Sequence, residues 1–437
     1  MRAKKPRATH LILFILSIFS AYLYIDRANI GTAAGVMKEE FGLTNVQLGV
    51  MFSAFSYAYT SIVWIGGWLA DRYGVRATLF VCGTVFSIGT IFTGLAGSWT
   101  ELLLARGIVG LGEAPSNATI SRALVSWTRP LHRGFAISVT HGSSRLGTAI
   151  TPPLVAWLIT MTSWRGSFLV LGTLGLVLMT VWLYYYRDDP RTHPSITPDE
   201  LVGLDPPETQ SRVPYFRLLR RYVPSIVTFF CYGWTLWIYL NWLPSFFAQN
   251  YHIDLKTSAI LSSTVLVAGI LGDLSGGILS DRLLARTSSL LISRTYLISG
   301  SFLATIVCMV PILISADITV VTIALMLAFF FVQTSVSPQW LVTMDISPRF
   351  VGTAGCFLSI GFALSGMLSP TVFGYLVDAL GNWRGAFGAS MILLAAGAVS
   401  ALWLRPDRPF VEGVSREGPK IESYSKVLSA NQAADRI

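Results

Sequence analysis

Four charged residues lie inside long apolar stretches of the sequence. Asp26 and Arg27 occur in LYIDRANIG, and Arg106 and Glu113 occur in LLLARGIVGLGEAPSNA. A charge within a membrane-spanning segment is costly unless it is paired or hydrated, so such residues usually mark a functional site. Arginine offers a carboxylate a fixed positive charge and several donors, whereas a carboxyl group in a medium of low dielectric can take up a proton. These residue types therefore predict anion binding and proton exchange.

The spacing of Arg106 and Glu113 indicates that they share one face of a helix. They are seven residues apart, and Gly110 and Asn117 lie on the same stripe. Such a face is too polar for lipid and is expected to line a cavity. At a rise of about 1.5 Å per residue, Arg27 and Arg106 lie at similar depth, and Glu113 lies near the midplane.

The composition indicates a membrane protein with many spans. Of the 437 residues, 53% are hydrophobic and 13% are charged, whereas a typical soluble protein carries about 25% charged residues. Apolar stretches that could cross a bilayer as helices recur twelve times. They cover residues 10–33, 47–70, 78–97, 101–126, 133–158, 165–186, 223–249, 258–280, 292–314, 318–340, 352–378 and 384–404.

These stretches form two sets around a polar, proline-rich linker. We predict an all-α membrane protein with twelve transmembrane helices in two six-helix halves, 1–186 and 223–404, with a linker at 187–222 and a cytoplasmic tail at 405–437. Lys and Arg concentrate in the termini, the linker and alternate loops. The positive-inside rule therefore places both termini in the cytoplasm and the protein in the cell membrane. The net charge of +9 is then a topology signal and not a nucleic-acid-binding face.

Internal repeats support a duplicated half. GGWLADRYGVR begins at Gly66 and GGILSDRLLAR begins at Gly276, while WRGSF and WRGAF begin at Trp164 and Trp383. Each pair occupies the same place in its half. A duplicated six-span unit of this kind predicts a central cavity between the halves and alternating access to it.

The repeated Gly-x-x-x-Asp-Arg-x-Gly-x-Arg loop resembles the signature of the major facilitator superfamily, and the resemblance covers nearly the whole chain. Within it, three stretches resemble the anion:cation symporter family, whose members import organic anions such as sugar acids with protons. The stretches are YIDRANI, FSYAYTSIVWIGGWLADRYG and LLLARGIVGLGEAPSNA. The resemblance implies the major facilitator fold, a transporter that is not an enzyme, no cofactor beyond the coupling proton, and a monomer as the functional unit.

The resemblance also implies roles for individual residues. Arg27 and Tyr59 match substrate-contacting positions, Asp26 and Glu113 match protonatable positions, and Arg106 matches an arginine that partners the acids. Each of these has a structural alternative, such as a fixed ion pair or ordinary aromatic packing. A second set, in the repeated loops, is expected to act as conformational latches or as topology anchors. These residues are Asp71, Arg72, Asp281 and Arg282.

Arg145 departs from the family pattern, which usually has a neutral residue near this position. It is expected near the midplane, with His141 four residues earlier on the same face. Arg145 could bind a second carboxylate of the substrate, or it could be a countercharge for Glu113. Asp273, inside another span, is expected to be a second acidic site or a partner for an arginine.

The C-terminal half offers further candidates for substrate binding. Ser359 matches a position at which sugar-acid carriers typically have an asparagine, and this difference weakens the sugar-acid assignment. Tyr232 and Asn241 lie in the aromatic stretch CYGWTLWIYLNWLP, where they could contact a ring or simply pack.

These features together predict a proton-coupled symporter that imports an organic anion such as a sugar acid, an aromatic acid or a dicarboxylic acid. An anion exchanger, a uniporter of the same fold and a non-transporting ligand sensor remain alternatives. The sequence contains no GxxxxGK[ST] motif and no histidine or cysteine pattern typical of a metal site. The expected partners are therefore the small anion and the lipid bilayer.

Overall fold

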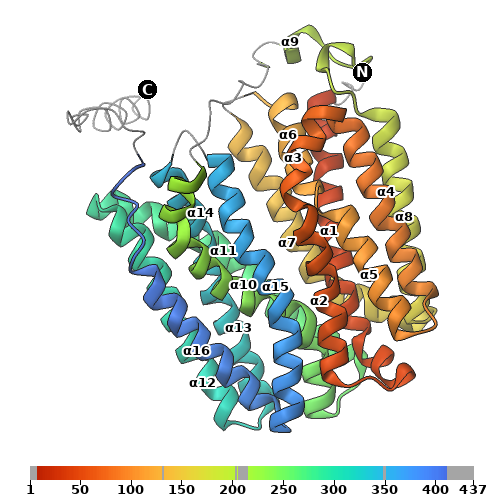
Figure 1. Cartoon of the computed structure of the whole chain (residues 1–437), viewed down its shortest axis with the longest axis vertical. Helices are drawn as coiled ribbons and strands as arrows, with labels where there is room; N and C mark the ends of the chain where they lie inside the picture. Colours follow the sequence, from red (N-terminus) through yellow and green to blue (C-terminus); the bar gives the residue numbers. More distant parts are fainter. Residues whose placement is uncertain (1–6, 130–131, 202–203, 205–214, 348–350, 411–437) are drawn as a thin grey trace, which may run out of the picture.

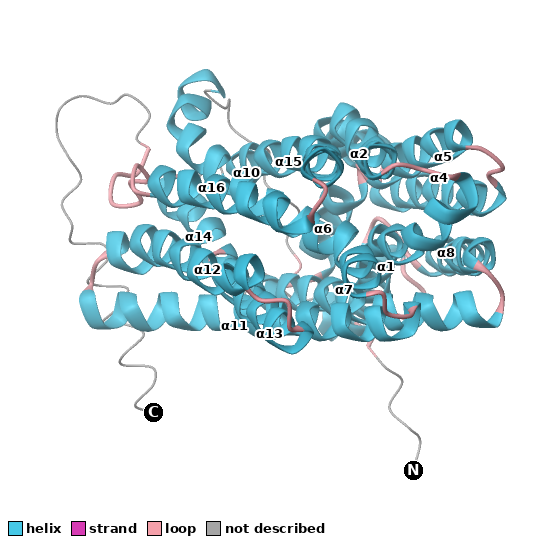
Figure 2. Cartoon of the chain, turned by 90° about the horizontal axis from the view of Figure 1, so that it is seen from below, coloured by secondary structure: helices cyan, strands magenta, loops and turns pink. Residues whose placement is uncertain are grey.

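The computed structural model describes residues 7–129, 132–201, 204, 215–347 and 351–410, and within these ranges the regular elements are helices, with no strand (Figure 2). Two helical bundles lie side by side, with the first half of the chain in one and the second half in the other (Figure 1). The sequence prediction of an all-α fold with two helical halves is confirmed.

Among the described residues, the N-terminal bundle contains eight α-helices and the 3₁₀ turn that follows the second of them. Polar caps start several of them: the Thr44 hydroxyl and the Gln47 side chain form a reciprocal capping box at the start of the second helix. The elements are α1 (Ala8–Phe41), α2 (Asn45–Ile62), the turn Val63–Ile65, α3 (Gly66–Tyr73), α4 (Val75–Leu95), α5 (Trp99–Glu113), α6 (Ser116–Trp127), α7 (Arg133–Met161) and α8 (Trp164–Tyr185).

The linker and the C-terminal bundle follow. The linker contains the turn Pro190–Thr192 and α9 (Pro198–Leu201). The bundle contains α10 (Tyr215–Tyr251), α11 (Leu255–Thr287), the π-helical stretch Leu291–Tyr296, α12 (Leu297–Ile314), α13 (Ile318–Thr334), α14 (Val336–Ile346), α15 (Val351–Leu380) and α16 (Trp383–Ala401). The predicted boundaries of the linker and of the tail fall partly outside the described residues and stay predictions.

All twelve predicted spans correspond to helical segments, but they are not equally regular. Nine helices among the described residues are long and apolar enough to cross a membrane. The spans predicted at 47–70 and 101–126 are each interrupted, the first by a 3₁₀ turn after α2 and the second at Pro115, which cannot donate a helical hydrogen bond. The span predicted at 133–158 lies within α7, which contains His141 and Arg145.

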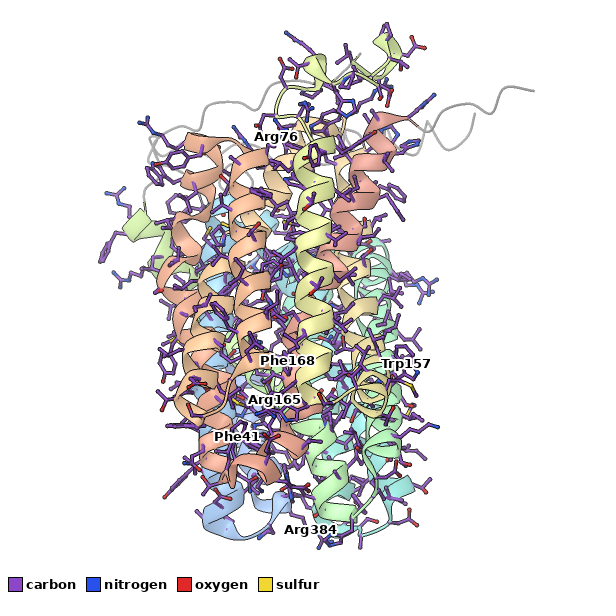
Figure 3. The ribbon with its side chains drawn as sticks, turned by 90° about the vertical axis from the view of Figure 1, so that its right-hand side faces the viewer. Phe41, Arg76, Trp157, Arg165, Phe168 and Arg384 are labelled. Atoms are coloured by element: carbon purple, nitrogen blue, oxygen red, sulfur yellow. The ribbon has the colours of Figure 1, made fainter. Side chains whose placement is uncertain are left out.

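The repeated WRG motif begins a helix in both halves, and the residue before it caps that helix. The Ser163 hydroxyl caps α8 by accepting from the Gly166 amide, and the Asn382 side chain caps α16 by accepting from the Gly385 amide. Arg165 and Arg384 lie towards one end of the molecule, opposite Arg76 (Figure 3). We call the end at which α1 begins and α8 ends the terminal end, and the opposite end, near the WRG motifs, the distal end.

The linker is fastened to the N-terminal bundle at the terminal end. One oxygen of Glu200 in α9 accepts from the amide and hydroxyl of Thr9, at 3.0 and 2.9 Å, and its other oxygen accepts from Thr197. Burial alone raises the pKa of Glu200, but these hydrogen bonds hold its pKa below the ordinary value. The ionised carboxylate therefore caps α1 and α9 at once.

The halves pack together through α2 against α15, α7 against α11 and α1 against α10 (Figure 1). Close approach depends on small residues. A Cβ added to Gly49 in α2 would lie 2.7 Å from the Cα of Thr371 in α15, a distance that real Cβ atoms do not show. A larger residue at position 49 would therefore push the two halves apart.

Among the described residues, polar contacts between the halves gather from the middle of the bundle to the distal end. The side-chain amide of Asn45 donates to Asp378 Oδ1 at 2.7 Å, and the backbone amide of Val46 donates to Asp378 Oδ2 at 3.0 Å. Lys38 Nζ lies 3.1 Å from Gln249 Oε1 across the same interface. The structure is thus closed at its distal end.

Ion pairs near the terminal end stay within one half. Arg122 pairs with Asp71 at 3.2 Å in the N-terminal bundle, and Arg294 pairs with Asp345 at 2.9 Å in the C-terminal bundle. These pairs brace each bundle separately, so they allow the halves to separate at this end.

Replacing Asp378 with alanine is expected to loosen the distal closure, because Asn45 and Val46 lose their shared acceptor. Two hydrogen bonds of about 1 kcal/mol each correspond to at least about a tenfold rise in the population open at this end. Spin labels at the exposed residues Glu39 and Leu380, in a variant without native cysteines, would report the change as longer distances.

Asp254→Ala is the matched control for that experiment. Asp254 is also an acidic residue at the distal end, but it caps its own helix, α11, by accepting from Thr257. The control should leave the distance distribution unchanged. An unchanged distribution in Asp378→Ala would show that the carboxylate does not hold the halves together.

Candidate functional site

Asp26, Arg27, Arg106 and Glu113 converge in the interior of the N-terminal bundle, and we call these four residues the charge cluster. Arg27 Nε donates to Glu113 Oε1, and Arg106 Nη1 lies 3.7 Å from Asp26 Oδ2. All four residues are buried, with at most 4% of any one exposed. The cluster therefore consists of two ion pairs between α1 and α5, withdrawn from lipid and from water.

Neighbouring helices hold the charge cluster from its sides. Thr90 on α4 donates to Asp26 Oδ1 at 2.7 Å, while the other carboxylate oxygen of Asp26 faces Arg106. The guanidinium of Arg27 lies over the rings of Tyr24, Tyr59 and Phe55, at 4.8, 5.3 and 5.5 Å from their centroids. Cation–π attraction at such distances stabilises the arginine where water is excluded.

The stripe predicted on α5 explains how α2 reaches the cluster. Gly110 lies between Arg106 and Glu113, and a Cβ there would lie 3.0 Å from the backbone nitrogen of Tyr59. The absence of a side chain at Gly110 lets α2 pack directly on α5. Tyr59 is therefore brought beside Arg27, with its hydroxyl 3.5 Å from Asn117 Nδ2.

Several polar atoms of the charge cluster have no hydrogen-bond partner among the described residues. They include Arg27 Nη2, Glu113 Oε2 and Arg106 Nη1. Buried polar atoms of this kind are uncommon in folded proteins and call for an explanation. A ligand oxygen at Arg27 Nη2 would satisfy one of them, and a proton on Glu113 Oε2 would remove the negative charge from that oxygen. The arrangement is therefore chemically suited to an anion and a proton.

A separate ion pair, outside the charge cluster, joins the two halves near the middle of the bundle. Arg145 Nε on α7 lies 3.3 Å from Asp273 Oδ2 on α11, and Asp273 Oδ1 accepts from Ser337 at 3.0 Å. Of the two expectations for Asp273, the structure therefore supports the partner of an arginine. Glu113 is paired with Arg27, so Arg145 is not its direct countercharge.

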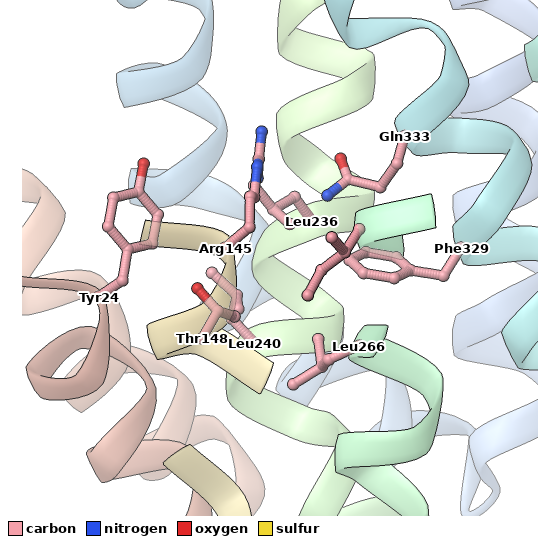
Figure 4. A pocket seen from close by; sticks show the side chains of 9 residues that line it. Tyr24, Arg145, Thr148, Leu236, Leu240, Leu266, Phe329 and Gln333 are labelled. Atoms are coloured by element: carbon pink, nitrogen blue, oxygen red, sulfur yellow. The ribbon is translucent and has the colours of Figure 1, made fainter. Parts of the chain in front are cut away.

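A pocket adjoins Arg145 between the halves, and we call it the central pocket. Its free space is small, about 10 Å³, which is roughly the room of one water molecule. Figure 4 shows Tyr24 and Gln333 on either side of Arg145, with the Gln333 amide directed towards the arginine. The lining residues are Tyr24, Arg145, Thr148, Leu236, Leu240, Leu266, Ile270, Phe329 and Gln333.

Tyr24 connects the central pocket to the charge cluster, although sequence reasoning did not select it. It lies three residues before Arg27, hence about one helical turn away on the same side of α1. That spacing was the available signal. Gln333 was also missed, and its signal was a polar residue near the end of the apolar run ITVVTIALMLAFFFVQT.

The structure separates the candidates of the C-terminal half. The Tyr232 hydroxyl donates to Gln333 Oε1 at 2.7 Å and lies beside Arg145. Tyr232 therefore holds two residues that line the central pocket, although it does not line the pocket itself. Asn241 donates to the Trp237 carbonyl at 3.0 Å within α10, and Ser359 donates to the Gly355 carbonyl at 2.9 Å within α15. Neither is among the residues that line the central pocket.

The latch candidates lie at the terminal end. Asp71 pairs with Arg122, whereas Arg72, Asp281 and Arg282 have exposed side chains. A role in gating stays a prediction for these four residues. Among the described residues, no group of three or more His, Cys, Asp and Glu side chains is placed to hold a metal ion.

Comparison with protein families and curated proteins identifies relatives along nearly the whole chain. The model of the Major Facilitator Superfamily matches residues 16–359. The chain is 38% identical over 411 residues to the probable sulfoacetate transporter SauU of Cupriavidus necator, covering 92% of this chain and 95% of that protein. It is 28% identical over 433 residues to the hexuronate transporter of Bacillus subtilis, covering 96% and 99% of the two chains.

Solved structures share the fold at low sequence identity. The crystal structure of a bacterial homologue of the human lysosomal transporter Spinster superposes with a TM-score of 0.72 at 18% identity, covering 92% of this chain and 95% of that one. The D-xylose–proton symporter superposes with a TM-score of 0.71 at 16% identity, covering 91% and 97%. These similarities support the arrangement of helices described above.

The Arg27–Glu113 pair predicts a strong energetic coupling between the two residues. Arg27→Gln or Glu113→Gln alone leaves a buried, unpaired charge and is expected to cost about 3–5 kcal/mol of stability. The double variant removes both charges and should recover most of that loss. Thermal unfolding of the purified protein in detergent would measure all four members of this cycle.

The surface pair Arg165–Glu40 supplies the control cycle. Its side chains are 35% and 40% exposed, so the same substitutions there should change stability by less than about 1 kcal/mol. Additive losses at Arg27 and Glu113 would contradict the pairing.

Proposed function

The chain belongs to the Major Facilitator Superfamily, a family of transporters, and from that premise we propose that it imports an organic anion together with a proton. The substrate is proposed to be a small carboxylate or sulfonate. The relatives support this class, because their names specify transport of sulfoacetate, hexuronate and D-galactonate.

The observation that carries the proposal is the buried pair of Arg27 and Glu113 with unused polar atoms on both partners. Without substrate, the ionised carboxylate of Glu113 accepts a hydrogen bond from the guanidinium of Arg27, the group that an anion would need. A proton on Glu113 removes the negative charge and frees Arg27 to bind the substrate. Proton and anion then favour each other's binding, and this linkage is reciprocal.

The charge balance of the cluster supports the same scheme. Its two arginines and two acids sum to zero when both acids are ionised. One proton therefore leaves one unit of positive charge, which a single anionic group neutralises. Asp26 is held by Thr90 and Arg106, so we assign the exchangeable proton to Glu113 and a positioning role to the Asp26–Arg106 pair.

Alternating access supplies the route of transport, and the proton gradient sets its direction. The positive-inside prediction orients the terminal end towards the cytoplasm, so the distal closure formed by Asp378 and its partners would face the outside. Rocking of the halves 1–186 and 223–404 would open the site to each side in turn. One copy of the chain suffices for this scheme, because the charge cluster and the central pocket lie within a single chain.

Uptake into liposomes tests the proposal. With sulfoacetate, a hexuronate and galactonate as substrates, an acidic exterior should increase uptake of at least one anion. Arg27→Gln should abolish uptake because the anion loses its cation. Glu113→Gln should abolish accumulation driven by the pH gradient and retain exchange of labelled for unlabelled anion, because the neutral side chain mimics the protonated state.

Glu101→Gln is the matched control, because Glu101 lies on the same helix as Glu113 but accepts a hydrogen bond from the Gly97 amide at the exposed start of α5. It should keep its response to pH. Uptake that follows sodium and ignores pH would refute proton coupling.

A further inference from the structure

The ion pair between Arg145 and Asp273 has features that suit a binding site better than a permanent brace. Its side chains are 19% and 23% exposed, whereas those of the charge cluster are almost completely buried. The pair therefore remains accessible from the space between the halves. Arg145 also lines the central pocket, so a ligand in that pocket would meet its guanidinium directly (Figure 4).

Tyr24 places Arg145 close to the arginine that we assign to the substrate. The guanidinium of Arg27 lies 4.8 Å from the centre of the Tyr24 ring, and the same phenol lines the central pocket beside Arg145. One short molecule beside Tyr24 could therefore reach both cations.

We propose that the central pocket is a subsite for a second acidic group, and that the protein selects short dianions in which one acid binds Arg27 and the other displaces Asp273 from Arg145. This inference rests on the proposed anion transport and names its substrate class. Dicarboxylates and sulfocarboxylates with a short carbon chain meet the requirement.

The surroundings of the pair allow this exchange. Ser337 already donates to Asp273, so the carboxylate keeps a partner after Arg145 leaves it. Thr148 and Gln333 add polar groups beside Arg145, while Leu236 and Phe329 are suited to contact a carbon chain. A bidentate arginine contact prefers a carboxylate or sulfonate over a neutral amide, because only the anion provides a charge-assisted pair of hydrogen bonds.

The exchange has a consequence for the contact between the halves. Arg145 lies on α7 and Asp273 on α11, which belong to different bundles. A dianion at Arg145 would replace a contact between two helices with one mediated by the substrate. Occupancy of the subsite would thus alter the α7–α11 interface, which a monoanion bound only at Arg27 would leave intact.

Matched substrate pairs test the subsite. Succinate and its monoamide succinamate have the same length but differ by one charge, as do sulfoacetate and sulfoacetamide. In liposomes with an acidic exterior, the unaltered protein should take up at least one dianion about tenfold or more faster than its monoamide. Arg145→Gln should reduce this ratio to about one, mainly by lowering dianion uptake.

Further variants separate substrate binding from structural support. Asp273→Asn should preserve the dianion preference, because Arg145 remains and loses its competitor. The double variant Arg145→Gln, Asp273→Asn leaves no unpaired acid at position 273. It should also lose the preference for the dianion, because Arg145 is absent. The control Arg384→Gln changes an exposed arginine at the distal end and should keep it. Equal losses of dianion and monoamide uptake in Arg145→Gln would indicate a brace only and would overturn the subsite.

The two proposals fail in different ways. Equal uptake of both members of each pair by the unaltered protein would overturn the subsite and leave proton-coupled anion transport intact. A dianion preference that ignores the pH gradient would overturn proton coupling and retain the subsite. Thermal stabilisation of the unaltered protein by succinate but not by succinamate provides a check that requires no variant, and equal stabilisation would count against the subsite.

Discussion

The buried contact between Arg27 and Glu113 is the interaction on which the interior of the N-terminal bundle depends. Taking two opposite charges out of water costs several kcal/mol for each ion, and only close pairing with further polar or aromatic contacts offsets this cost. Gly110 lets α2 approach, and the rings over Arg27 exclude water. A neutral aliphatic pair of similar volume is often as stable, and the proposed binding of an anion and a proton gives the two charges a use.

The Arg145–Asp273 pair follows a different design from the charge cluster. The cluster lies within one bundle, so motion of the halves leaves its geometry unchanged. The Arg145–Asp273 pair crosses between α7 and α11, so it depends on how the halves are arranged. In the proposed mechanism, the pair within one bundle is suited to recognise the charge of the ligand, and the pair between the bundles is suited to couple ligand binding to the arrangement of the halves.

The sequence predicted the elements well because helix length and apolar runs follow from chemistry within one segment. The face shared by Arg106, Gly110 and Glu113 could likewise be read from a period of 3.6 residues. The partner of Arg145 could not, since periodicity contains no information on which helix lies opposite α7. Tyr24 was missed for a related reason: a tyrosine in an apolar span is ordinary until a second cation is found beside it.

The Glu200 clamp shortens the tether between the two bundles. Because this carboxylate fastens α9 to the first turn of α1, the chain from Tyr186 to Leu201 is held against the first bundle. Residues 187–201 therefore do not lengthen the connection between the bundles, and residues inserted upstream of the clamp would leave that connection unchanged.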